Sequence, residues 1–167
     1  MQKLHDLLGL PILEIETGIQ IGEVREVILD IEMASVIGIM ISGSSWFADN
    51  QGFLFHDLFS IGRDAVTIRS SRKAIAEFIS SEVTCSLKEL LNKQIFTETG
   101  LNLGVLVDVL FEPSTGEIKA YQVSDGIITD LIHGRMLMPL PQVQVVGGDK
   151  LIVPETMAKL IHPEPQE

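Results

Sequence analysis

Residues 16–30 read ETGIQIGEVREVILD, and residues 98–112 read ETGLNLGVLVDVLFE. Five of the fifteen positions are identical, and most of the others exchange Ile for Leu, Gln for Asn or Glu for Asp. The two copies begin 82 residues apart (98 − 16). A unit of that length present twice is typical of two small domains and not of a solenoid.

Each copy predicts a β-rich domain. A helical turn, a strand, a Thr-Gly turn, a long strand interrupted by glycine and an apolar strand follow one another in both copies. Glycine supplies positive φ at turns and bulges, so we interpret Gly18, Gly22, Gly100 and Gly104 as structural turn and bulge residues. They precede strand-like segments and no Gly-Lys-Ser/Thr follows, which argues against a phosphate-binding loop.

The helical turns carry their own signals. Gly9 and Asn92 follow the opening turn of each copy, and both residue types favour a left-handed C-terminal cap. Ser86 and Glu89 have the spacing of a capping box.

Two further helices are predicted, one at the end of each copy. The first runs from about residue 71 to residue 80 and the second from about residue 155 to residue 161. We therefore divide the chain into domains at 1–82 and 83–167, with the first of these helices as the bridge.

The repeated pattern resembles the PRC-barrel family. In each copy a strand precedes T-G-x-x-h-G-x-h-x-[DE]-V-h-h-[DE], where h is apolar, and a Gly-[Arg/Gly]-Asp hairpin comes later. That small β-barrel is shared by the cytoplasmic part of the photosynthetic reaction-centre H subunit and the C-terminal domain of a ribosome-maturation factor. The chain is most similar to stand-alone bacterial proteins with two such barrels. The resemblance implies a mainly β fold, two small PRC-like β-barrels in tandem, each with short flanking helices.

The chain departs from that family pattern in three ways. Glu26 stands where the family usually has Asp, which the second copy keeps as Asp108. The membrane helix of the reaction-centre subunit and the separate N-terminal domain of the ribosomal factor are not expected in this chain. Neither the role of the reaction-centre subunit nor that of the ribosome-maturation factor can therefore be assigned as a whole to this chain.

Composition limits the classes of partner. The 167 residues are 46% hydrophobic, which suffices for a packed core, and the net charge is −11. A strongly acidic surface repels phosphate, so free nucleic acid and anionic membranes are not expected partners. The longest uncharged apolar stretch, residues 36–41, is far shorter than the about 20 residues of a membrane span. The single Cys85 and the absence of a signal-peptide pattern favour a cytoplasmic location.

No catalytic constellation stands out, so we expect a protein that is not an enzyme and holds no cofactor or metal. The acidic run Glu23, Glu26, Asp30 and Glu32 fits a solvated strand edge, and a divalent-cation site is its alternative interpretation. The four histidines are scattered without the spacing of zinc ligands.

Two long loops, at residues 43–52 and 125–134, are the predicted partner-binding elements. Apolar side chains on a loop either pack back onto the domain or contact a partner, and Trp and Phe are frequent interface anchors. The candidate partner-binding residues are Trp46, Phe47, Ile127, Ile128, Leu131 and Ile132.

Two functions follow as hypotheses. The first is a non-catalytic adaptor or assembly module that binds a protein partner, or self-associates into an oligomer, through PRC-barrel surfaces and loops. The alternative is a small-ligand or metal-binding regulatory protein that uses the acidic strand edge or a groove between the barrels.

Overall fold

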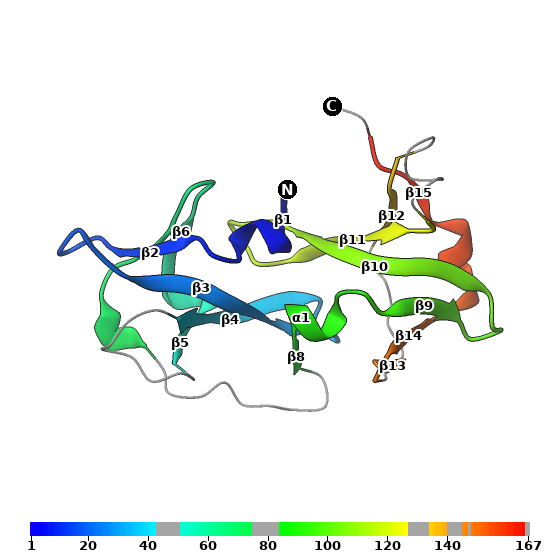
Figure 1. Cartoon of the computed structure of the whole chain (residues 1–167), viewed down its shortest axis with the longest axis horizontal. Coiled ribbons are helices and arrows are strands. Elements are labelled where there is room, and N and C mark those ends of the chain that lie inside the picture. The colour runs from blue at the N-terminus through cyan, green and yellow to red at the C-terminus, as the bar shows by residue number, and fades with distance from the viewer. Residues whose placement is uncertain (43–50, 75–83, 127–133, 140–144, 147, 166–167) are drawn as a thin grey trace. The chain divides into compact units, whose positions relative to one another are not determined.

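Strands dominate the fold and form two sheets (Figure 1). The computed structural model describes the chain except for residues 43–50, 75–83, 127–133, 140–144, 147 and 166–167. Two compact units make up the chain: Met1–Glu89 with Phe111–Glu117, and Leu90–Leu110 with Ile118–Glu167. The units differ from the sequence repeats, because residues 84–89 and 111–117 of the second copy belong to the first unit.

The first unit contains most of the short elements. Its strands are β1 (Gln2–Lys3), β2 (Pro11–Glu14), β3 (Ile19–Asp30), β4 (Ser35–Ser42), β5 (Gly52–Leu54), β6 (Leu58–Ile61), β7 (Val66–Ile68) and β8 (Thr84–Ser86). Three 3₁₀ helices, η1 (Leu4–Leu7), η2 (Phe55–Asp57) and η3 (Ser71–Lys73), lie between them, and α1 (Leu87–Leu90) begins in this unit.

The sheet of the first unit has the strand order β5-β4-β3-β2-β7-β6, and β8 pairs with β3 beside this path. β3 and β4 form its long antiparallel pair (Figure 1). The β2–β7 pair is parallel, whereas the other pairs are antiparallel. β6 is therefore an edge strand whose one sheet neighbour among the described strands is β7.

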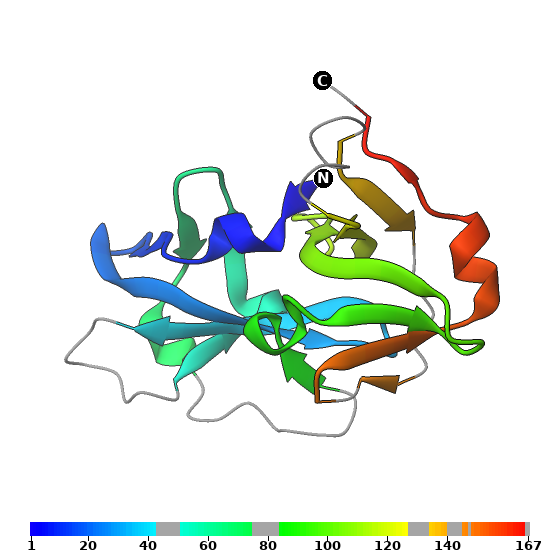
Figure 2. The same cartoon turned by 45° about the vertical axis from the view of Figure 1, so that its right-hand side comes forward.

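The second unit repeats this plan. Its elements are β9 (Gln94–Thr97), β10 (Asn102–Phe111, whose last residue belongs to the first unit), β11 (Ile118–Ser124), β12 (Met136–Pro139), β13 (Val145–Val146), β14 (Lys150–Val153), η4 (Glu155–Lys159) and β15 (His162–Pro163). The order is β13-β14-β9-β10-β11-β12-β15. In Figure 2, β14 (orange) lies along β9 (green), the parallel pair that corresponds to β7 and β2.

Alternating apolar side chains form a core in each unit. In the first unit, the core includes Ile12, Val27, Leu29, Ile39, Phe53, Val66 and Ile68, each at most 1% exposed. In the second, it includes Ile95, Leu106, Val109, Val123, Met138, Leu151 and Val153. Burying one such side chain contributes about 1.5–3 kcal/mol, so these faces supply much of the favourable folding energy of each unit.

The two glycines inside the long strands create equivalent bulges. The register shifts where Gly22 in β3 meets β2 and where Gly104 in β10 meets β9. A Cβ on Gly22 would lie 2.7 Å from the carbonyl oxygen of Ser42, and one on Gly104 would lie 2.4 Å from that of Ser124. In each copy, the backbone of the long strand thus passes close to the backbone of the following strand, at the repeated Gly and Ser positions.

The predicted caps are confirmed. Gly9 has φ 82° and Asn92 has φ 68°, and each donates its N–H to a carbonyl of the long strand of its own copy, Val24 and Leu106 respectively. The Ser86 and Glu89 side chains each accept the backbone N–H of the other residue, as a capping box requires.

Three further expectations can be compared with the structure. Of the helix expected over 71–80, the described residues hold η3, which ends at Lys73 and is followed by extended backbone at Ala74, and residues 75–80 lie outside the described residues. The chain after the apolar strand of the first copy is not one continuous strand, because a single 3₁₀ turn, η2, separates β5 from β6. The resemblance implied two β-barrels, but β14 pairs with β13 and β9, and in the described residues neither strand order closes on itself.

Candidate functional site

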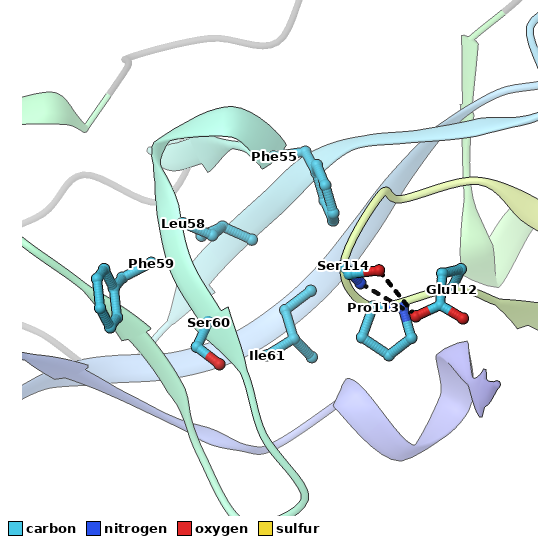
Figure 3. A pocket seen from close by; sticks show the side chains of 8 residues that line it. All are labelled: Phe55, Leu58, Phe59, Ser60, Ile61, Glu112, Pro113 and Ser114. Atoms are coloured by element: carbon cyan, nitrogen blue, oxygen red, sulfur yellow. Dashed lines mark hydrogen bonds between the residues drawn. The ribbon is translucent and has the colours of Figure 1, made fainter.

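A pocket of about 440 Å³ opens in the first unit (Figure 3). It lies between β6 and the turn that joins β10 to β11. Its lining residues are Phe55, Leu58, Phe59, Ser60, Ile61, Glu112, Pro113 and Ser114. Five of these residues are apolar, whereas Ser60 on β6 and Glu112 and Ser114 on the turn are polar. Apolar residues combined with a few polar groups are typical of ligand-binding sites.

The η2 turn places the aromatic wall of the pocket. Leu54 and Leu58 on either side of η2 have extended backbones, so one helical turn redirects the chain between β5 and β6. Phe55 and Ile61 point toward the 112–114 turn in Figure 3, whereas Phe59 points away from it. Phe59 is 52% exposed, and the Arg69 guanidinium lies 4.5 Å from its ring centroid.

The opposite wall is the turn at 112–117, which packs tightly on η2 and β4 of the same unit. A Cβ on Gly116 would lie 3.0 Å from ring atoms of Phe55, so the ring packs directly against the glycine backbone. Gly116 also has φ 76°, a conformation that glycine adopts without strain. Its carbonyl accepts the N–H of Val36 at 2.8 Å, and Ser35 and Glu117 form an isolated antiparallel bridge. A segment of the second copy thus completes the pocket beside β6.

The charge of the pocket comes from Glu112. It is the one charged residue among the eight that line the pocket. Its Oε1 accepts hydrogen bonds from the Ser114 hydroxyl at 3.0 Å and from the Ser114 N–H at 3.4 Å (Figure 3). The bonds hold the carboxylate beside the turn. The pocket therefore combines apolar residues with one charged residue, Glu112.

The six predicted partner-binding residues lie outside the described residues, in 43–50 and 127–133. The pocket residues were missed by the sequence reasoning. One signal was present, namely Phe53, Phe55 and Phe59 within seven residues. Phe53 is fully buried, but the other two are not, and that difference marks them as wall residues.

A family comparison accounts for the duplicated plan. The model of the PRC-barrel domain matches residues 1–75 and again residues 82–160. The chain belongs to the PRC-barrel family. No curated protein matches it. Among the described residues, no helix of this PRC-barrel protein is long and apolar enough to cross a membrane.

One acidic PRC-barrel position is structural. Glu26 was expected on a solvated strand edge, but it is only 8% exposed, and its Oε1 accepts the N–H groups of Val27 at 3.0 Å and Lys88 at 3.4 Å. Lys88 is the second residue of α1, so the carboxylate satisfies a donor in the first turn of that helix. In the second copy, the buried Asp108 accepts the N–H of Val109 in the same way. The acid at this position fixes local backbone in both copies.

The other acids of the run Glu23, Glu26, Asp30 and Glu32 do not form a cluster. Asp30 accepts the Met33 N–H in a turn, while Glu23 and Glu32 are exposed. In the described part of the chain, no three His, Cys, Asp or Glu side chains converge as metal ligands would. His56 contacts Asp57 at 3.4 Å at the exposed η2 turn.

A second acid links the Thr-Gly turn of each PRC-barrel copy to a 3₁₀ helix, η3 after β7 in the first copy and η4 after β14 in the second. In the first copy, Glu14 on β2 accepts the Thr17 hydroxyl at 2.6 Å and the Ser71 N–H at 2.6 Å. In the second copy, the acid is Glu155 on η4, which accepts the Thr99 hydroxyl. The carboxylate therefore comes from the strand before the Thr-Gly turn in the first copy and from the 3₁₀ helix in the second copy.

These bonds predict a specific acid sensitivity. The Thr17 hydrogen bond, followed by that of Ser71, holds the pKa of Glu14 below its ordinary value of 4.5. A carboxyl with a lowered folded-state pKa stabilises the fold above its unfolded-state pKa, and that stabilisation is lost as the pH falls through the folded-state value. We expect Glu14→Gln to lower the melting temperature at pH 7 and the difference from wild type to shrink as the pH falls below 4.5 toward the lowered folded-state pKa of Glu14.

Thermal unfolding followed by circular dichroism between pH 3 and pH 7 measures this difference. Glu16→Gln removes a charge from the same exposed turn and should track the wild type at every pH. A gap between Glu14→Gln and wild type that stayed constant down to pH 3 would contradict the role of the Glu14 carboxylate.

Proposed function

We propose that this PRC-barrel protein is a non-catalytic, cytoplasmic adaptor or assembly module that binds a protein partner. Domains of this family are known as protein-interaction modules. The observation that carries the proposal is the pocket between β6 and the 112–117 turn. Most of its lining residues are apolar, one wall is the edge strand β6, and the half-exposed Phe59 is among the lining residues.

The acidic groups favour a scaffold over an enzyme. A general acid or base must reach the reacting proton, which calls for an accessible group with room beside it. The carboxylate oxygens of three acids instead accept hydrogen bonds from backbone N–H groups and, in one case, from a threonine hydroxyl. These acids are Glu26, Glu14 and Asp108. These hydrogen bonds stabilise the shape of a docking surface.

Affinity capture from the lysate of the source organism tests the proposal. The bait proteins are the wild type, Ser114→Arg in the pocket, Thr115→Arg in the same turn, and the loop variant Trp46→Ser/Ile128→Ser, each checked for a wild-type circular dichroism spectrum. We expect one protein to bind the wild type and Thr115→Arg and to be reduced about tenfold or more on Ser114→Arg.

The captured protein must also bind the purified chain directly, and light scattering after size exclusion shows whether that protein is a second copy. Selective loss on the loop variant would keep the adaptor function and move the interface to the loops at residues 43–52 and 125–134. A chain that captures no protein specifically and stays monomeric would contradict the adaptor function.

A small-ligand regulatory function is the second candidate, because the pocket volume falls within the range of about 300–1,000 Å³ that is usual for ligand sites. A ligand that binds only the folded state raises the melting temperature. A metabolite that does so with the wild type, but not with Ser114→Arg, would favour this candidate over the adaptor.

A further inference from the structure

We propose that the pocket receives a short, extended, basic segment of the partner protein, which adds a strand to the free edge of β6. This proposal rests on the adaptor function and names the chemistry of the partner at the same pocket. Three features support it: the contact of the pocket with a strand edge, the spacing of its apolar groups, and its charge.

The pocket lies along the edge of β6, as its lining shows. Successive side chains of a strand point to opposite faces, so a cavity over one face touches alternate residues. This pocket touches four in succession, Leu58 to Ile61, which places it against the backbone edge. That edge has no sheet neighbour among the described strands. Extended peptides bind such edges through main-chain hydrogen bonds.

The length and irregularity of β6 favour a short segment over a second copy of the chain. β6 has only four residues, and its register with β7 shifts between Leu58 and Ser60. Short edge strands with bulges resist sheet-to-sheet pairing of whole domains. A few residues of a flexible partner segment fit such an edge, whereas a long strand would meet the bulge.

The apolar groups define what the segment must present. Phe55 and Ile61 point toward the turn across the pocket, and Pro113 closes it there (Figure 3). A peptide strand on the β6 edge directs every second side chain to the same side, so alternate apolar residues would enter this space. Phe59, half exposed beneath the Arg69 guanidinium, offers a second contact outside it.

The charge selects a basic segment. Glu112 is the one charged lining residue, and the chain carries a net charge of −11. A Lys or Arg side chain on the peptide would carry the charge opposite to that of the Glu112 carboxylate. The overall negative charge also attracts basic segments and raises their rate of encounter.

Selection from a phage-displayed library of random linear peptides tests the proposal. We expect the enriched peptides to alternate apolar residues and to carry Lys or Arg. Fluorescence anisotropy of a selected peptide should show an affinity about tenfold or more weaker for Ser114→Arg, which fills the pocket and repels a basic peptide, and within about twofold of wild type for Thr115→Arg. Both variants carry the same added charge in one turn, and Thr115 does not line the pocket.

N-methylation of the peptide isolates the strand pairing, because it removes one main-chain donor and leaves the side chains and the protein unchanged. Methylation of the amides that face β6 should abolish binding, and methylation of the alternate amides should preserve it. Enriched peptides that are acidic or lack alternation, or binding that tolerates every N-methylation, would overturn the proposal.

The two proposals fail separately. A captured partner whose binding ignores Ser114→Arg would refute the peptide site and leave the adaptor function standing. An adaptor that captures nothing, together with a library that enriches nothing, would refute both. Selected peptides that bind elsewhere, shown by equal affinity for Ser114→Arg and wild type, also refute the peptide site.

Discussion

Gly104→Ala is expected to destabilise the chain by about 3 kcal/mol or more, the sum of backbone strain and overpacking. The added methyl group would lie 2.4 Å from the carbonyl oxygen of Ser124 and 2.9 Å from a methyl of Val123. The oxygen belongs to the backbone of the neighbouring strand β11, so it cannot rotate away. The φ of 115° at Gly104 adds strain of its own.

Gly100→Ala is the matched control for this substitution. Gly100 has φ 91°, but a Cβ there would meet no atom within 4 Å. Its substitution should therefore cost only the left-handed strain, about 1–2 kcal/mol. Urea unfolding followed by circular dichroism gives both values. Equal losses for the two variants would mean that the close approach of β10 and β11 does not constrain residue 104.

A fragment ending at residue 82 is expected to lack a cooperative unfolding transition. It contains the whole first sequence copy but not the residues of the second copy that complete the first unit. Among them, β8 pairs with β3 through Ser86, Cys85 and Thr84, and Leu87 is fully buried. Burial of Leu87 alone contributes about 1.5–3 kcal/mol, a large share of the stability of a domain of this size.

The same fragment loses the turn at 112–117. The N–H of Val36 then has no Gly116 carbonyl to bind, and the face of Phe55 that packs against Gly116 becomes exposed. Adding the 83–167 fragment should restore a cooperative transition, because it returns these groups. Heat-capacity scans of each fragment and of their mixture measure this. A sharp transition for 1–82 alone would show that the first copy is an independent domain.

Local chemistry was predictable from sequence wherever one residue type determines the backbone. Gly9, Asn92 and the two strand glycines have conformations that few other residues tolerate, and each copy repeats the signal. The Ser86–Glu89 capping box depends on residues three apart. Such features need no knowledge of the tertiary fold.

Features that join distant residues were not predictable. From the sequence alone, Glu26 resembles a solvated acid, because the N–H that it accepts belongs to Lys88, 62 residues later in the chain. The pocket requires Gly116 against Phe55, a pairing that alternation within one strand cannot reveal. Periodicity tells which face of a strand is apolar, but not which segment covers it. The division of the chain at residue 82 stays a prediction from the repeats, and the repeats gave no sign that residues 84–89 and 111–117 join the first compact unit.

The most direct measurement of where the partner binds is a titration of isotope-labelled protein with the captured partner or a selected peptide, followed by amide chemical shifts. We predict that the first and largest shifts fall on β6, on Phe55 and on the turn at Glu112–Ser114, and that they vanish in Ser114→Arg but persist in Thr115→Arg. Shifts confined to other strands, with the amides of β6 unchanged, would contradict the assignment of this pocket as the binding site.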